Sequence, residues 1–297
     1  MVEVPMDKRL AYLDTSSWNK LHAEIQTNHI KPDALHNFRV MFSSNILDEL
    51  VAIDDPKLRK DIAKLTRDIC YPWPFNHHIQ MMAIEVLRWH EKTPLKFADY
   101  LLYDNHFRNT WQAVAEGLPG IDFVATLASN RMAYWKDNFK AQLLAGRDMH
   151  AVLMKQLGVE TGMTSDDLAA FRGTDDLPKA ICEDIVNDQQ HLREWAKVYL
   201  PLCLGSRVPI DRFDEVDLQA TPCLRVGAQY YCALTVLAAS RAVKKPNRGD
   251  LGDSHHAVYA GAVDYLVTED AKLKDIIQNY LVDVPAEVCS LSEVLSL

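Results

Sequence analysis

Four acidic residues occupy positions where metal-assisted chemistry is expected. Asp14, Glu49, Asp253 and Asp270 each lie where an apolar, strand-like run passes into a helix-like stretch, or open such a helix. At the carboxyl ends of parallel strands, such groups face one crevice and repel each other unless a cation lies between them. Because oxygen ligands suit Mg²⁺ or Mn²⁺, which commonly assist phosphodiester cleavage, the sequence predicts a divalent-metal site for that reaction.

The elements that position these acids are expected at the two ends of the chain. Short apolar runs predict strands at 8–13, 38–42, 265–268 and 284–290. Capping and periodicity predict helices after Thr15 or Ser16, from Ser44 or Asn45, over 222–243, from Asp253, over 271–280 and, through a capping box, after Ser290. Asp264 precedes its strand, so it is expected far from the crevice.

The middle of the chain has a different texture. Helical periodicity is found over 57–70, 77–91, 94–103, 126–157, 165–172 and 177–199, whereas 205–217 is typical of a loop. Strand-like alternation is nearly absent there. Because a long insertion costs little loop-closure entropy, the pattern predicts an α/β sheet split by a large helical insertion.

Several of these segments resemble the PIN-domain family of metal-dependent ribonucleases. The resemblance rests on Tyr12-Leu13-Asp14-Thr15-Ser16, on Ser44 with Leu47-Asp48-Glu49-Leu50, on Asp253 with His256-Ala257 and Ala260, and on the apolar strand that ends in Thr268-Glu269-Asp270. The last two pieces are the most specific. The resemblance covers roughly residues 8–54 and 222–297.

The resemblance implies a three-layer PIN-like parallel sheet with helices on both faces. Residues 1–54 and 222–297 would form the nuclease domain, and 55–221 the all-helical insertion. Asp14, Glu49, Asp253 and Asp270 would be the catalytic residues and would hold Mg²⁺ or Mn²⁺, with the Thr268 hydroxyl supporting the site. Asp250 is either a further ligand or a plain turn residue beside Gly249.

Each candidate also has a structural interpretation. Asp14 and Asp270 could be helix N-caps, and Glu49 could belong to the first turns of a surface helix. Asp48 points about a quarter-turn away from Glu49 and is ranked below it. The pairs His77-His78 and His255-His256 do not predict a zinc site, because no third nitrogen or sulfur ligand lies at a useful spacing.

A basic run precedes Asp253 and consists of Arg241, Lys244, Lys245 and Arg248. Cations are favoured at a helix C-terminus, which accounts for part of the run. The alternative is a phosphate track that binds substrate and leads to the metals. The sequence leaves both interpretations open.

Composition adds context. The net charge of −9 is not typical of a nucleic-acid-binding protein, although a metal nuclease needs basic residues only along its substrate path. The six scattered cysteines predict a reducing compartment with neither a disulfide framework nor a zinc knuckle. The charged N-terminus is not typical of a signal peptide, and the most apolar stretch, 230–239, is too short to span a bilayer. The expected location is the cytoplasm, with no membrane partner.

These observations predict a metal-dependent endoribonuclease with RNA as its partner. Two alternatives remain open: a degenerate PIN-like module that binds RNA or protein without cutting it, and a structure-specific DNA nuclease of the same fold. The oligomeric state is also open, and a homodimer is compatible with the sequence. Presence of all four acids argues against the degenerate module.

Overall fold

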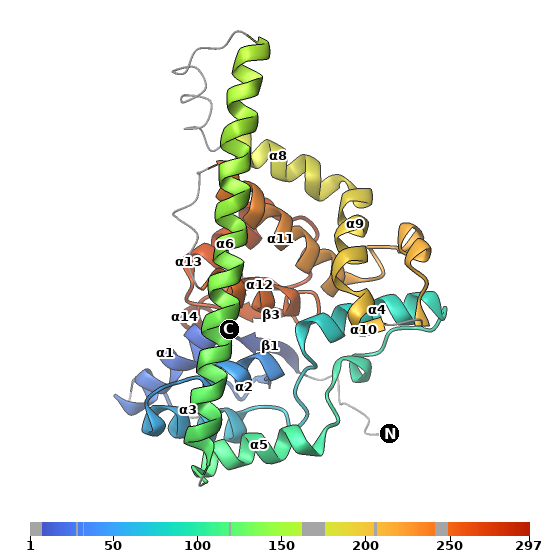
Figure 1. The fold of residues 1–297 in the computed structure, drawn as a ribbon. Helices are drawn as coiled ribbons and strands as arrows, with labels where there is room; N and C mark the ends of the chain where they lie inside the picture. Colours follow the sequence, from blue (N-terminus) through green and yellow to red (C-terminus); the bar gives the residue numbers. More distant parts are fainter. Residues whose placement is uncertain are drawn as a thin grey trace.

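The computed structural model describes residues 8–27, 29–31, 33–118, 120–161, 176–204, 207–240 and 249–297. Within them the chain is an α/β protein with one four-stranded, all-parallel sheet in the order β2-β1-β3-β4 (Figure 1). The strands are β1 (Arg9–Leu13), β2 (Phe38–Met41), β3 (Tyr265–Val267) and β4 (Glu287–Cys289). All four lie where the sequence predicts strands, although β4 is shorter than expected. The parallel sheet thus joins segments from opposite ends of the chain.

The register brings the carboxyl ends of the strands together. Leu13 pairs with Val267, and Val267 pairs with Cys289. Just beyond, the Asp14 amide donates to the Val267 carbonyl at 3.0 Å. The residues after β1 and β3 therefore share one edge of the sheet, as the crevice argument requires.

The N-caps of the first two helices lie one residue before the first of the caps that the sequence predicts. Asp14 caps α1 (Thr15–Gln26), and Ser43 caps α2 (Ser44–Val51). The predicted caps Thr15 or Ser16 and Ser44 or Asn45 are therefore wrong, because the residue that ends each strand region supplies the capping oxygen. Glu49 consequently lies in the second turn of α2.

The middle of the chain is helical, with corrections to its boundaries. It contains α3 (Pro56–Ile69), α4 (His78–His90), α5 (Asn105–Glu116), α6 (Ile121–Thr161), α8 (Asp176–Asn187), α9 (Gln189–Tyr199) and α10 (Pro201–Leu204). The helix expected over 94–103 is only the 3₁₀ turn Phe97–Tyr100, and α5 was not predicted. The helix expected over 177–199 is divided at Asp188, which caps α9. A 3₁₀ helix, Ile210–Glu215, interrupts the expected loop, and the expected helix over 165–172 lies outside the described residues.

The C-terminal elements follow the predicted order. They are α11 (Pro222–Ser240), α12 (Asp250–Tyr259), α13 (Ala271–Tyr280) and α14 (Leu291–Val294). Helix α12 starts at Asp250 rather than at Asp253, so Asp250 belongs to its first turn and is not a loop residue. Ser290 and Glu293 form the predicted capping box.

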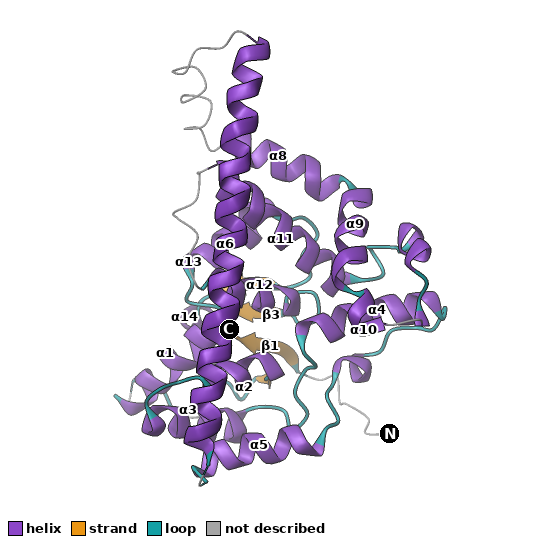
Figure 2. Ribbon diagram, viewed as in Figure 1, coloured by secondary structure: helices purple, strands orange, loops and turns teal. Residues whose placement is uncertain are grey.

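Helices flank the sheet in an arrangement compatible with a three-layer α/β fold. Figure 2 shows β1 and β3 between α12 and α13 above and α1 and α3 below, while the long helix α6 runs across the molecule. Helix α6 contacts α2, α11 and α12, so the middle of the chain covers both terminal segments. No helix in the described ranges is both long enough and apolar enough to cross a membrane.

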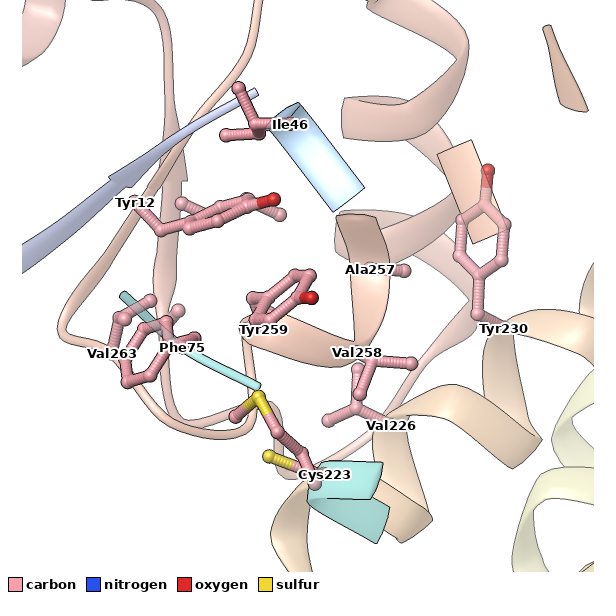
Figure 3. Close-up of a cluster of buried hydrophobic side chains, with 14 of the residues drawn as sticks. Tyr12, Ile46, Phe75, Cys223, Val226, Tyr230, Ala257, Val258, Tyr259 and Val263 are labelled. Atoms are coloured by element: carbon pink, nitrogen blue, oxygen red, sulfur yellow. The ribbon is translucent and has the colours of Figure 1, made fainter. Parts of the chain in front are cut away.

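An aromatic stack joins three parts of the chain in the core. Tyr12 of β1 stacks on Tyr259 of α12 at 4.4 Å between ring centroids, and Tyr259 stacks on Phe75 at 5.8 Å (Figure 3). All three side chains are fully buried. Because these residues come from the first strand, the helical middle and the C-terminal segment, the three parts share one hydrophobic core.

Candidate active site

Asp14 is held at the edge of the sheet by a complete set of hydrogen bonds. Its Oδ1 accepts from the Ser17 amide at 2.8 Å and from Ser16 Oγ at 2.7 Å. Its Oδ2 accepts from Thr268 Oγ1 at 2.6 Å, and Thr268 Oγ1 in turn accepts from the Asp270 amide at 3.0 Å. Asp14 is therefore a helix cap, and the same contacts fix its carboxylate beside the end of β3.

Glu49 forms a buried ion pair with a histidine that sequence reasoning did not assign. His256 Nε2 lies 3.3 Å from Glu49 Oε2, which also accepts from the Thr15 hydroxyl. His256 Nδ1 bonds the Tyr12 hydroxyl at 2.9 Å. Burial works against a carboxylate here, yet the neighbouring His256 lowers the pKa of Glu49 to about 2. Conversely, burial works against imidazolium, and Glu49 overcomes it and raises the pKa of His256.

A glycine permits this pairing. A Cβ atom on Gly252 of α12 would lie only 2.9 Å from Glu49 Oε1. The missing side chain thus lets α12 approach the carboxylate on α2 closely.

The remaining acids meet at the start of α12 and α13. Asp270 caps α13, since its Oδ1 accepts from the amides of Lys272 and Leu273 at 2.7 and 2.9 Å. Asp250 is completely buried and pairs with Lys272 Nζ at 2.5 Å. Lys272 therefore offsets the charge of Asp250, which would have to leave this cation to become a metal ligand.

Asp253 is the least satisfied of the acids. Its carboxylate accepts no hydrogen bond from the described part of the chain. Burial and then the Asp270 carboxylate raise the pKa of Asp253 to about 7, and Asp250 adds to the rise. A carboxyl group with this pKa is only partly ionised near neutrality, because burial and the neighbouring acids outweigh the opposing charges of His256 and Lys272.

The fold brings the predicted acids within electrostatic range of one another. Glu49, Asp14 and Asp253 all act on His256, and Asp270 acts on Asp253. Within the described ranges, however, no three His, Cys, Asp or Glu side chains are arranged as a ready-made metal site. The acids thus lie near one another, and the oxygens of Asp14, Glu49, Asp250 and Asp270 are directed to internal hydrogen bonds.

A buried phenol faces the same charges. The Tyr230 hydroxyl of α11 is buried and has no hydrogen-bond partner among the described residues. Burial raises the pKa of Tyr230 well above its ordinary value, and Asp253, Asp250 and Asp270 raise it further. Tyr230 therefore keeps its proton and offers a donor next to the acidic cluster. Figure 3 shows its ring apart from the Tyr12–Tyr259 stack.

The remaining residues singled out in the sequence lie outside the acidic cluster or outside the described residues. Asp48 is exposed, and Asp264 accepts from the Leu10 amide at 2.7 Å at the opposite end of the sheet, as expected. The basic run Arg241, Lys244, Lys245 and Arg248 lies outside the described residues. Sequence reasoning missed His256, Lys272 and Tyr230; only the position of His256 one helical turn after Asp253 was a usable signal.

Comparisons with protein-family models, with curated proteins and with solved structures found no significant match to this chain.

Proposed function

We propose that this chain is a PIN-like, metal-dependent nuclease that hydrolyses phosphodiester bonds, with RNA as the favoured substrate. The observation that carries the proposal is the Asp253 carboxyl, which accepts no hydrogen bond from the described residues and whose pKa is raised to about 7 by burial, Asp270 and Asp250. A structural acid is normally paired or hydrogen-bonded when it is removed from water. Like charges held together without a partner favour a bound cation.

The donors in the crevice suit Mg²⁺ or Mn²⁺. Asp253, Asp270, Asp14 and Glu49 offer only oxygen atoms, which these hard ions prefer. Such an ion would supply an activated water and would offset charge on the leaving oxygen. Asp250 pairs with Lys272 and would therefore not contact the ion directly.

Residues around these donors prepare the site. Thr268 orients the Asp14 carboxylate through its 2.6 Å hydrogen bond, and His256 keeps Glu49 ionised. Tyr230, which retains its proton, can donate a hydrogen bond to an oxygen that enters the crevice. None of these residues needs to form a covalent intermediate, so attack by water is the expected route.

The rival from another class is a PIN-like module that binds RNA or protein without cleaving it. The satisfied hydrogen bonds of Asp14 favour this alternative, because a group that serves fully as a helix cap needs no other role. The lack of any hydrogen bond to the Asp253 carboxylate from the described residues opposes it. A nuclease of the same fold that acts on structured DNA differs only in substrate.

The deciding experiment compares cleavage of RNA and DNA panels by the wild type, Asp253→Asn and Asp264→Asn, with Mg²⁺, Mn²⁺ or EDTA. Loss of an outer-shell partner already costs about 10–100-fold in metal sites, so Asp253→Asn should lose more than about 100-fold in turnover. Asp264→Asn is the matched control, since it changes the same group at the far end of the sheet.

Thermal melts complete the test. A ligand that binds only the native state stabilises it, by about 2.7 kcal/mol at a hundred times its dissociation constant. Mg²⁺ or Mn²⁺ should therefore raise the melting temperature of the wild type and of Asp264→Asn, but not of Asp253→Asn. A wild type that neither cleaves nor responds to metal would favour the binding module.

A further inference from the structure

A cavity of about 400 Å³ adjoins the acidic crevice, and Glu49 belongs to both. Its walls come from α2, from the start of α4, from α6 and from α12. The volume falls within the range of small-molecule sites, about 300–1,000 Å³. The proposed hydrolysis of phosphodiester bonds does not by itself use this cavity.

Three histidines line the cavity: the adjacent pair His77 and His78, and His255 from the C-terminal part of the chain. His78 stacks on His255 with ring centroids 3.8 Å apart and planes 19° apart, and His77 lies 4.1 Å from His78. Nearly parallel rings present flat faces, and their nitrogens do not converge on a common point. The cluster is thus suited to stacking rather than to holding an ion.

The central histidine of this group is uncharged. Burial, followed by the neighbouring His255 and His77, lowers the pKa of His78 well below its ordinary value. The Asn45 side-chain amide donates to His78 Nδ1 at 2.9 Å, which leaves the proton on Nε2. His78 is therefore an uncharged ring with a fixed tautomer in the wall of the cavity.

Helix α6 supplies a further part of the wall and a cation. Ala128 and Met132 line the cavity, and Lys136 follows at the same four-residue spacing, so the three share one face of α6. Lys136 lies close enough to Glu49 and His255 to act on their charges. The same helix thus offers apolar contacts inside and a positive charge next to them.

We propose that this cavity binds one unpaired nucleobase of the substrate strand, stacked against the histidine wall, while Lys136 contacts an adjacent phosphate. Single-stranded bases are commonly recognised by stacking on aromatic side chains, with cations on the backbone. The carboxylates of Asp48 and Glu49 in the walls disfavour a phosphate inside, so a neutral ring is the better occupant. The inference rests on the proposed nuclease function and adds that the strand is single-stranded at this point.

The first test blocks the cavity. Ala128→Trp places an indole in it, and Leu127→Trp adds the same group at a neighbouring position that is 54% exposed. The probe is a single-stranded oligoribonucleotide carrying 2-aminopurine, measured by fluorescence titration in EDTA so that cleavage does not occur. Because one stacked base contributes about 1–3 kcal/mol, binding by Ala128→Trp should weaken on the order of tenfold or more, and Leu127→Trp should match the wild type.

A second pair of variants removes the stack without adding bulk. His255→Ala should weaken binding of the probe as Ala128→Trp does. His255→Phe, which keeps a flat ring, should retain most of the wild-type affinity. A strand with an abasic nucleotide at this position, followed through a fluorescent label at its end, should bind to the wild type and to His255→Ala equally. Equal affinities for all variants, or failure of the Phe variant, would overturn the stacking pocket.

The outcomes separate this inference from the nuclease itself. If the wild type cleaves RNA and Ala128→Trp cleaves with an unchanged KM, the base pocket is wrong and the nuclease stands. If no strand is cut but the probe binds with the predicted variant pattern, the pocket stands and the nuclease is wrong.

Discussion

Glu85 and Asp253 have pKa values raised to about the same level, about 7, yet their surroundings are opposite. Glu85 of α4 lies at the buried start of α11, where the amides of Cys223 and Leu224 donate to it at 2.9 and 2.8 Å. The Tyr100 hydroxyl donates as well. Asp253 accepts no such bonds from the described residues and faces Asp270 instead.

The difference shows why a shifted pKa does not by itself identify an active site. At Glu85, burial raises the pKa, and hydrogen bonds from Tyr100 and the α11 amides limit the rise. At Asp253, burial and a like charge act in the same direction. The first carboxyl has a structural role that its contacts explain fully. The second accepts no hydrogen bond from the described residues, and the charges of His256 and Lys272 offset the rise in its pKa only in part.

The sharpest test of this contrast is the loss of each side chain. Glu85→Ala removes the acceptor for two buried amides and a hydroxyl, and each unsatisfied group costs about 1–3 kcal/mol. The free energy of unfolding should therefore fall by about 3–5 kcal/mol, measured by urea denaturation. Asp253→Ala should leave it unchanged or raise it without metal, since it relieves repulsion. Equal losses in the two variants would break the comparison.

The pH dependence of stability gives the next largest effect. Because the folded state raises the pKa of Glu85 from 4.5 to about 7, it binds more protons than the unfolded state in that window. The stability that this group contributes is thus complete below about pH 4.5 and is lost as pH rises through 7, by at most about 3 kcal/mol.

Asp253 acts in the same direction, so the test needs the Asp253→Asn background. Urea denaturation of that variant at several pH values between 4.5 and 8 should still show stability falling with pH. Adding Glu85→Gln should make the curve less steep, and the slope that remains belongs to other groups such as His256, whose pKa is also raised. An unchanged slope in the double variant would contradict the role of Glu85.

The local patterns explain why the outline of the crevice was predictable. Asp14 and Asp270 stand directly where a strand ends and a helix begins, and parallel strands bring such positions together. The sequence could not predict His256 as the partner of Glu49, because the two residues are 207 positions apart in the chain. The stacked histidines arise in the same way, since His78 and His255 meet only through the packing of α4 and α12.

The errors in the helical middle also have physical causes. Apolar spacing over 94–103 suggested a helix, but Asp99 bonds the Lys96 amide and Arg88, which stabilises only the short 3₁₀ turn. Helix α5 was missed although Asp104 caps its start and Gly117 ends it with φ of 68°. Capping residues were the usable signal there, and hydrophobic periodicity alone was insufficient.

The smallest predicted effect concerns Asp14, whose carboxylate is both a helix cap and a proposed metal ligand. Sequence reasoning favours an Asp14→Asn variant as stable as the wild type or more so, because it removes one charge from an anionic cluster. The hydrogen bonds point the other way. Asparagine can still cap α1 through its carbonyl oxygen, but its amide replaces Oδ2, the acceptor of Thr268 Oγ1. We therefore expect a loss of about 1 kcal/mol, or about 2–4 °C in the thermal melt, together with loss of cleavage.

Thr268→Val provides the matched comparison for that prediction. It removes the same hydrogen bond and also the acceptor of the Asp270 amide, but leaves the charge of Asp14 in place. If the bond governs stability, Thr268→Val should lose at least as much as Asp14→Asn while retaining part of the cleavage. If Asp14→Asn instead melts above the wild type, repulsion outweighs the bond, and Asp14 belongs with Asp253 as an acid that the fold alone does not satisfy.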